Sequence, residues 1–146
     1  MVKAGTFQSV WDALDSLGVE RVDHGVRSID DPALVERIAR TQVPLTVCPV
    51  SNVALKVYPT LAAHPIKRLM DQGVLVTLNS DDPPMFHTDV LDNYFQVTDT
   101  FNLALSQVEA LARDSFRASF MDDTTKTAYL GRFDEEARRL RAELAG

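Results

Sequence analysis

Three short apolar runs, each preceded by a segment of helical periodicity, constrain this chain most strongly. They cover residues 19–24, 43–48 and 74–79, and their ends fall near residues 24, 48 and 80. A repeat of about 25 to 32 residues accommodates a strand, a loop and a helix, as parallel strands require. The third run is apolar almost throughout, which is typical of strands covered on both faces. The pattern predicts an α/β fold with a parallel sheet.

Capping residues and periodicity mark the helices around these strands. Gly18 ends the first helix in the position that glycine favours, and Asp30-Asp31 before Pro32 supplies an N-cap for the second. The predicted helices cover residues 8–17, 64–72, 89–101 and 108–120, the last opened by a capping box at 106–109, and the helix that starts at Pro32 has its apolar face on residues 33–39. We expect the charged segment 134–145 to be a solvated surface helix or a fraying tail.

Composition excludes several classes of function. The 146 residues include 21 acidic and 15 basic side chains, so a net charge of −6 leaves no basic face for nucleic-acid phosphates. The single cysteine, Cys48, cannot form an internal disulfide, and no apolar run approaches the roughly 20 residues that span a bilayer. Residues 1–10 show no secretion or lipid-attachment signal. We expect a cytoplasmic protein without nucleic-acid or membrane partners.

Polar residues follow all three predicted strands. They lie in the segments 23–25, 48–52 and 79–83. Because functional sites of parallel α/β proteins are built at the carboxyl ends of the strands, these segments together predict a site.

Two adjacent carboxylates, Asp81 and Asp82, are the most informative residues of that set. Neighbouring like charges raise each other's pKa unless a cation or a hydrogen-bond donor compensates them. A divalent metal on Asp81, with Asp82 turned to a substrate nitrogen, would satisfy this demand. Equally, one aspartate could cap a helix that begins near Pro83. His24 could be a general base, although a lone histidine is more often a structural residue.

The other candidate side chains have simpler interpretations. His64 is expected at a helix entry and His87 in an exposed loop. Cys48 lies in an apolar strand with no base beside it, which favours a buried, inert thiol. Ser51 and Asn52 are expected to satisfy loop backbone groups, with lining of the site as the alternative.

Taken together, three motifs resemble the adenosine/adenine deaminase family. They are Val22-Asp23-His24-Gly25-Val26-Arg27-Ser28, Pro44-Leu45-Thr46-Val47-Cys48-Pro49-Val50-Ser51-Asn52 and Val76-Thr77-Leu78-Asn79-Ser80-Asp81-Asp82-Pro83. The resemblance covers about residues 11–120 and is greatest to the branch that acts on free adenine. It implies a zinc-dependent (β/α)8 barrel of the TIM type that replaces the 6-amino group of a purine by oxygen and releases ammonia.

The resemblance also implies roles for three residues. His24 would orient and deprotonate the zinc-bound water, Asp81 would be a zinc ligand, and Asp82 would hydrogen-bond a purine ring nitrogen. The family's His-x-His pair, a further zinc histidine and a glutamate that protonates the ring have no counterparts here, since the sequence has three histidines at other spacings. Residues 3–6, Lys-Ala-Gly-Thr, stand where the family has His-Ala-Gly-Glu.

The missing ligands and the length predict an incomplete barrel. A barrel of this type needs at least roughly 200 residues, so three strands within 146 residues correspond to its carboxyl-terminal part, from the sixth strand onward. We expect residues 1–146 to form one incomplete deaminase domain with a helical tail at 121–146. Its partner would be a complementary barrel half or a second copy, and the chain alone would be inactive. An adenosine deaminase and a non-catalytic barrel subunit are the alternatives.

Overall fold

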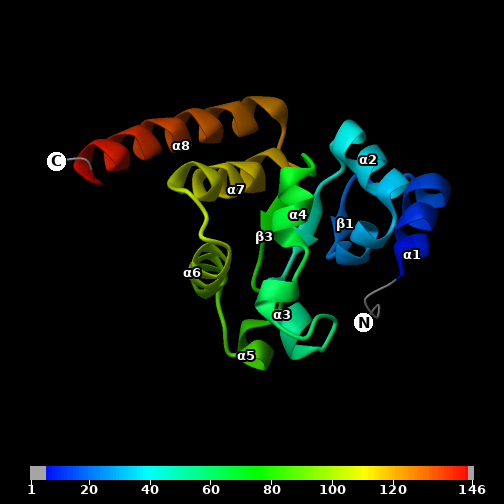
Figure 1. The fold of residues 1–146 in the computed structure, drawn as a ribbon. Helices are drawn as coiled ribbons and strands as arrows, with labels where there is room; N and C mark the ends of the chain where they lie inside the picture. The colour runs from blue at the N-terminus through cyan, green and yellow to red at the C-terminus, as the bar shows by residue number, and fades with distance from the viewer. Residues whose placement is uncertain (1–5, 145–146) are drawn as a thin grey trace.

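The computed structural model describes residues 6–144 and shows a small parallel sheet surrounded by helices (Figure 1). The strands are β1 (Val22–Asp23), β2 (Leu45–Val47) and β3 (Val76–Leu78), in the spatial order β1-β2-β3. Both pairs are parallel, with Leu45 opposite Val22 on one side and Val76 on the other. The predicted α/β class and the parallel arrangement are confirmed.

The strands are shorter than the apolar runs that predict them. Chain direction changes immediately after β1, because His24 has a φ angle of 61° in the left-handed region. Parallel hydrogen bonding nevertheless continues past the strand ends: the N–H of His24 donates to Thr46 O at 2.9 Å, and the N–H of Asn79 donates to Val47 O at 2.9 Å. The ends predicted for the first and third strands, near residues 24 and 80, therefore hold.

Strand alternation gives this sheet one polar and one apolar face. Asp23, Thr46 and Thr77 are cross-strand neighbours, and Thr46 Oγ1 donates to Asp23 Oδ1 at 2.8 Å. Thr77 Oγ1 accepts from Asn79 Nδ2 at 2.9 Å. The opposite face carries Val22, Leu45, Val47, Val76 and Leu78. Among the described strands, only β3 is buried at every position, whereas β1 and β2 contain residues that are at least partly exposed.

Eight α-helices and three short helical turns complete the described chain. The helices are α1 (Phe7–Asp12), α2 (Pro32–Thr41), α3 (Pro49–Ala54), α4 (Ile66–Asp71), α5 (Pro83–Phe86), α6 (Val90–Phe101), α7 (Leu105–Arg117) and α8 (Asp123–Leu144). The turns are the π turn η1 (Ala13–Leu17) and the 3-10 turns η2 (Val26–Asp30) and η3 (Leu61–Ala63). Of the described helices, none combines the length and the apolar composition needed to cross a membrane.

Three of the predicted helix boundaries are confirmed by their caps. Gly18 adopts the left-handed conformation after η1, Asp31 Oδ1 accepts from the N–H of Ala33 at 3.0 Å, and Asp89 forms a capping box that opens α6. The capping box predicted at 106–109 is wrong. Helix α7 begins at Leu105. The side chain of Gln107 accepts a hydrogen bond at 3.0 Å from the N–H of Ala104, the residue just before the helix.

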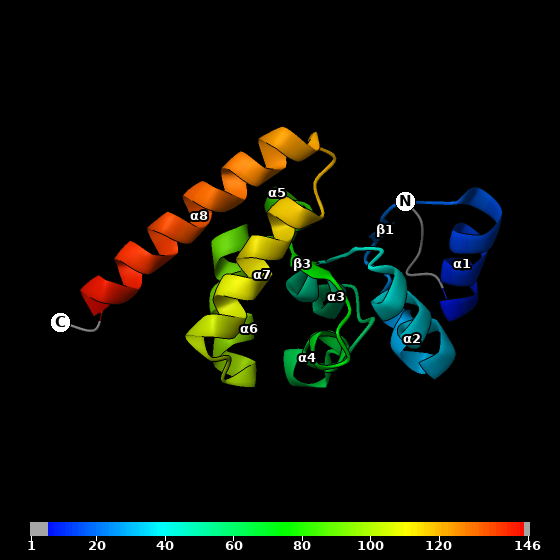
Figure 2. The ribbon, with the colours of Figure 1, turned by 90° about the horizontal axis from the view of Figure 1, so that it is seen from above.

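The core lies between the apolar face of the sheet and the helices. Helices α4, α6 and α7 all pack on β3, while α1 and α2 contact η2. Figure 2 shows α1 and α2 on one side of the strands and α6 and α7 on the other. The fully buried large residues include Leu34, Ile38, Leu45, Ile66, Leu69, Val76 and Val97.

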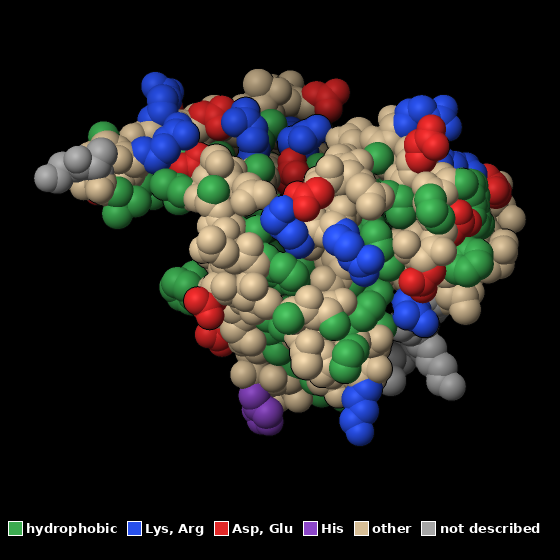
Figure 3. Space-filling model, in the orientation of Figure 1, with side chains coloured by type: hydrophobic (Ala, Val, Ile, Leu, Met, Phe, Trp, Pro, Cys, Tyr) green, Lys and Arg blue, Asp and Glu red, His purple; other side chains and the backbone are tan. Residues whose placement is uncertain are grey.

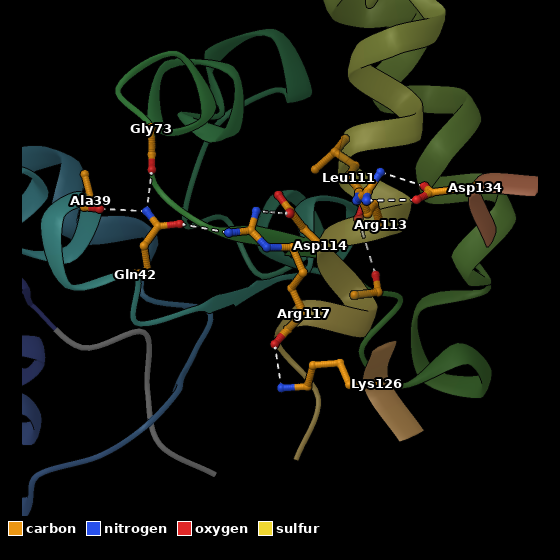
Figure 4. Close-up of polar contacts among 10 residues, drawn as sticks. Ala39, Gln42, Gly73, Leu111, Arg113, Asp114, Arg117, Lys126 and Asp134 are labelled. Atoms are coloured by element: carbon orange, nitrogen blue, oxygen red, sulfur yellow. Dashed lines mark hydrogen bonds and ion pairs between the residues drawn. The ribbon is translucent and has the colours of Figure 1, made fainter. Parts of the chain in front are cut away.

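Polar contacts from Gln42 connect three helices at the end of the sheet where the strands begin. Gln42 Nε2 donates to Ala39 O at 2.6 Å and to Gly73 O at 3.0 Å (Figure 4). Its Oε1 accepts from Arg117 at 3.5 Å, and Arg117 also binds Asp114 at 2.8 Å. The ends of α2, α4 and α7 are thereby held together.

Helix α8 is a surface helix with no buried residue. It is attached to α7 by the Arg113–Asp134 ion pair at 2.6 Å and by Phe116, which stacks on Tyr129 with ring centroids 5.9 Å apart. Acidic and basic side chains are intermingled along α7 and α8 (Figure 3). Of the two outcomes predicted for segment 134–145, the solvated helix holds as far as residue 144.

Gly18 and Gly25 both have the left-handed conformation, but only at Gly25 would an added Cβ also clash with a neighbour. Comparing alanine substitutions at the two positions therefore separates backbone strain from steric clash. A Cβ at Gly25 (φ 62°) would lie 2.7 Å from Leu45 Cδ2, whereas a Cβ at Gly18 (φ 59°) would meet nothing within 4 Å. We expect Gly18→Ala to cost about 1 kcal/mol of unfolding free energy from conformation alone. Gly25→Ala should cost about 2–4 kcal/mol, because Leu45 must also move within the core. Urea denaturation of both variants measures the difference, and equal losses would contradict this packing.

Candidate active site

Two consecutive left-handed residues place His24 at the end of β1. His24 and Gly25 have φ angles of 61° and 62°, so the chain turns sharply as it leaves the strand. Non-glycine residues rarely adopt this conformation, and its cost of about 1–3 kcal/mol is often found at functional sites. The His24 N–H remains bound to Thr46 O, so the imidazole is fixed at the carboxyl edge of the sheet.

Asp81 reaches the same edge from β3. Its φ angle of 64° is also left-handed. Asp81 Oδ2 accepts a hydrogen bond from Ser51 Oγ at 2.6 Å and lies 3.7 Å from His24 Nε2. Both side chains are about one-third exposed, at 34% for His24 and 29% for Asp81. The strand ends of β1 and β3 therefore bring together an imidazole and a carboxylate from distant parts of the sequence.

The second aspartate of the pair has a different environment. Asp82 is exposed, and its Oδ1 accepts from the N–H of Met85 at 2.9 Å, which makes it the N-cap of α5. The helix-cap alternative for the Asp-Asp pair is thus confirmed for Asp82, while Asp81 faces the histidine. The metal role of Asp81 and the substrate contact of Asp82 stay predictions. The second carboxylate oxygen of Asp82, Oδ2, takes no part in the cap.

Ser51 and Asn52 contact Asp81 and His24, which is the alternative of lining the site rather than the loop role expected first. They lie on α3, a helix that the sequence analysis does not predict, in which Pro49 occupies the first turn. Ser51 binds Asp81, and Asn52 lies between His24 Nδ1 at 3.3 Å and His64 Nε2 at 3.0 Å. Proline directly after a strand, a typical first residue of a helix, is the signal that could have indicated α3.

Cys48 completes a group of possible metal donors. One ligand atom each from His24, Cys48 and Asp81 lie within 4.8 Å of one another. Imidazole nitrogen, carboxylate oxygen and cysteine sulfur are donors that zinc accepts in proteins. Burial raises the pKa of the Cys48 thiol to about 12, and the carboxylate of Asp81 acts in the same direction. The predicted burial of the thiol is confirmed, but the expectation that no base lies beside it is wrong, because His24 and Asp81 are its neighbours.

The two remaining histidines differ in exposure. His64 is 2% exposed and precedes α4, where its Nδ1 accepts from the N–H of Ile66 at 3.1 Å. Burial lowers the pKa of His64 to about 4. His87 is exposed after α5. The helix-entry role of His64 and the exposure of His87 are confirmed. Residues 3–5, compared above with a zinc-ligand motif, lie outside the described residues.

Fold and site together define a protein of the class that builds its site at the carboxyl edge of parallel strands. The family model for adenosine deaminase matches residues 3–136. The chain therefore belongs to the adenosine deaminase family.

Similar proteins extend this finding. The chain is 51% identical over 130 residues to an adenine deaminase of Cupriavidus necator, a match that covers 89% of this chain and 37% of that protein. An adenine deaminase of Streptomyces coelicolor is 52% identical over 114 residues, which are 78% of this chain and 34% of that protein. The chain therefore spans little more than a third of the length of these relatives.

Solved structures agree in fold. The crystal structure of adenine deaminase from Arthrobacter aurescens matches with a TM-score of 0.88 and 39% identity, covering 92% of this chain and 41% of that one. An amidohydrolase from Burkholderia ambifaria, solved with bound Zn, matches with a TM-score of 0.87 and 26% identity, covering 96% of this chain and 39% of that one.

The buried His64 predicts a specific loss of stability in acid. Its pKa of about 4 in the folded protein lies below the ordinary value of 6.5, so the unfolded chain binds this proton first. Unfolding free energy should fall as the pH decreases between these two values, by up to about 3 kcal/mol from this group. Urea titrations from about pH 7 to pH 4 measure the effect.

Comparison with two variants isolates the contribution of His64 from those of the carboxylates. His64→Gln should lose the part of the pH dependence that belongs to the ring. His87→Asn, which removes an exposed imidazole, serves as the control and should keep the wild-type slope. Equal slopes for wild type and His64→Gln would contradict the burial of His64.

The single thiol gives a second chemical test. With a pKa of about 12 in place of 9.0, Cys48 has a thiolate fraction about a thousandfold lower at pH 8. Alkylation by iodoacetamide should therefore be slower by about this factor in the folded protein than in denaturant. Because the sequence has one cysteine, all labelling reports on Cys48. Similar rates in both states would contradict the burial of the thiol.

Proposed function

We propose that this chain supplies the carboxyl-terminal part of a zinc-dependent adenine deaminase, which converts adenine to hypoxanthine and ammonia. The observation that carries the proposal is the approach of His24 Nε2 to Asp81 Oδ2, 3.7 Å apart at the carboxyl edge of the sheet. The Cupriavidus necator and Streptomyces coelicolor relatives, both adenine deaminases, favour the free base over adenosine. Adenosine remains the alternative substrate.

The barrel position of the chain belongs to the same proposal. We assign β1, β2 and β3 to the last three strands of a (β/α)8 barrel, with residues 1–146 as part of one domain and 121–146 as its helical tail. The row formed by Asp23, Thr46 and Thr77 lies on the sheet face opposite Val22, Leu45 and Val76, and we assign it to the interior of the barrel. Strands β1 and β3 are the two edges of the sheet, where a complementary barrel half would add its strands.

The residues present suit a zinc ion. Asp81 would be its ligand, with Ser51 holding one carboxylate oxygen, since carboxylate oxygen is a donor that zinc accepts. A bound zinc ion would act as a Lewis acid that brings the pKa of a water molecule near 7. A catalytic zinc site takes about three protein ligands, so the remaining ligands would come from the complementary half.

The side chains of this chain would orient the reactants. His24 and Asp81 would hydrogen-bond the attacking water, and one of these two side chains would receive its proton. The oxygen of the water adds to the purine carbon that carries the amino group. Asp82 would accept a hydrogen bond from a ring N–H through Oδ2, because its Oδ1 is occupied by the helix cap. The amino group takes up a proton and leaves as ammonia, so that one hydrogen of the water ends on ammonia and the other on the purine ring.

Reconstitution tests the proposal. We would mix the chain with the amino-terminal part of the Cupriavidus necator enzyme that this chain does not match, and measure hypoxanthine formed from adenine with and without zinc. Turnover is expected only with both parts and zinc. Asp81→Asn should reduce kcat by more than about a hundredfold, and His24→Ala by about 10²–10⁴-fold.

Matched controls and alternative substrates sharpen the result. Asp71→Asn removes an exposed carboxylate that pairs with Lys67 and should leave turnover unchanged. Faster turnover of adenosine than of adenine would favour the alternative substrate. A stable complex of both parts without turnover of either purine would favour a non-catalytic barrel subunit, and turnover by this chain alone would overturn its assignment as one part of the site.

A further inference from the structure

A continuous line of polar contacts leads from a backbone amide to His24. The Ile66 N–H donates to His64 Nδ1 at 3.1 Å. His64 Nε2 lies 3.0 Å from Asn52 Oδ1, and Asn52 Nδ2 lies 3.3 Å from His24 Nδ1. His64 and Asn52 are 2% and 1% exposed. Water therefore has little access to the middle of this line, and each polar atom depends on its protein partner.

The backbone amide gives every hydrogen bond in this line its direction. An N–H can only donate, so His64 Nδ1 must be the unprotonated nitrogen and the proton of the neutral ring lies on Nε2. That N–H requires an acceptor, which is the carbonyl oxygen of the Asn52 side chain. The amide nitrogen of Asn52 consequently faces His24 and donates to its Nδ1.

Two alternatives to this arrangement, a turned Asn52 amide and a doubly protonated His64, are both unfavourable. If the Asn52 amide were turned round, its NH₂ group would face the N–H on His64 Nε2, two donors in a buried position, at a cost of the order of 1–3 kcal/mol. A doubly protonated His64 would instead oppose the Ile66 N–H with a second donor. Burial, which lowers the pKa of His64 to about 4, acts against this cation as well.

We propose that Asn52 is a positioning residue that holds neutral His24 in the tautomer protonated on Nε2, with His64 transmitting the constraint from the Ile66 backbone amide. Nε2 is the nitrogen that faces Asp81. His24 then donates a hydrogen bond at the reacting edge, and a proton that it received would have to go to Nδ1, against the Asn52 donor.

The tautomer of His24 assigns different roles to His24 and Asp81 in the proposed reaction. This assignment of roles rests on the proposed function. Asp81 becomes the acceptor of the water proton, and His24 stabilises the developing negative charge on oxygen by donation from Nε2. The role of His24 as a base, implied by the resemblance, is replaced by that of a donor. The tautomer itself is a property of this chain and does not depend on the substrate.

Nitrogen-15 NMR of the ring nitrogens tests the tautomer directly in the unmodified 146-residue protein. The sequence has three histidines, so assignment needs only the His64 and His87 variants for comparison. At a pH where imidazole is neutral, His24 should show its unprotonated nitrogen shift at Nδ1 and its protonated shift at Nε2. The opposite pattern in the wild-type protein overturns the proposal without any change to Asn52.

The variant Asn52→Asp should reverse the tautomer. A carboxylate can only accept, so His24 would place its proton on Nδ1, and the two nitrogen shifts should exchange while those of His64 stay in place. Asn93→Asp is the matched control, since Asn93 is also buried (0% exposed) and binds Thr88 and the backbone. It should leave the His24 spectrum unchanged. An unchanged His24 spectrum in folded Asn52→Asp would overturn the role of Asn52.

Activity and tautomer can fail separately. If the reconstituted protein does not turn over adenine but wild-type His24 is protonated on Nε2, the proposed function fails and the positioning role stands. If turnover is observed while His24 is protonated on Nδ1, the proposed function stands and the positioning role fails.

Discussion

Hydrogen bonding of β2 to both of its neighbours determines where the site lies. Its backbone holds the end of β1 through Thr46 and the end of β3 through Val47, so the residues that follow those two strands emerge on either side of it. The chain then turns through left-handed conformations at His24 and Asp81. These local conformations matter only because the parallel register has already brought the two strand ends to the same edge.

Helix α3 supplies the polar contacts that a strand edge alone lacks. It follows β2 directly and places Ser51 against Asp81 and Asn52 against His24. A carboxylate beside a partly buried imidazole needs donors to fix its orientation, and Ser51 provides one at 2.6 Å. The helix behind the strand ends thus contacts Asp81 through Oδ2 and His24 through Nδ1.

Much of the fold could be predicted from the sequence, because local signals determine it. The three strands, the Asp31 cap and the meeting of His24 with Asp81 follow from apolar runs, capping residues and the edge rule for parallel sheets. Asn52 could not be placed in this way, since its contact with His64 depends on how α3 packs against η3, the turn just before His64. The start of α7 was misplaced because Ser106 satisfies a capping pattern that the structure does not use.

The left-handed backbone at His24 and Asp81 has a consequence for how this chain tolerates change. Glycine enters that conformation more easily than histidine or aspartate, so it would relax the backbone at both positions. Natural or laboratory selection for a long-lived folded chain would then push these two positions toward residues without the ring or the carboxylate. Their retention would have to be maintained by a demand other than folding.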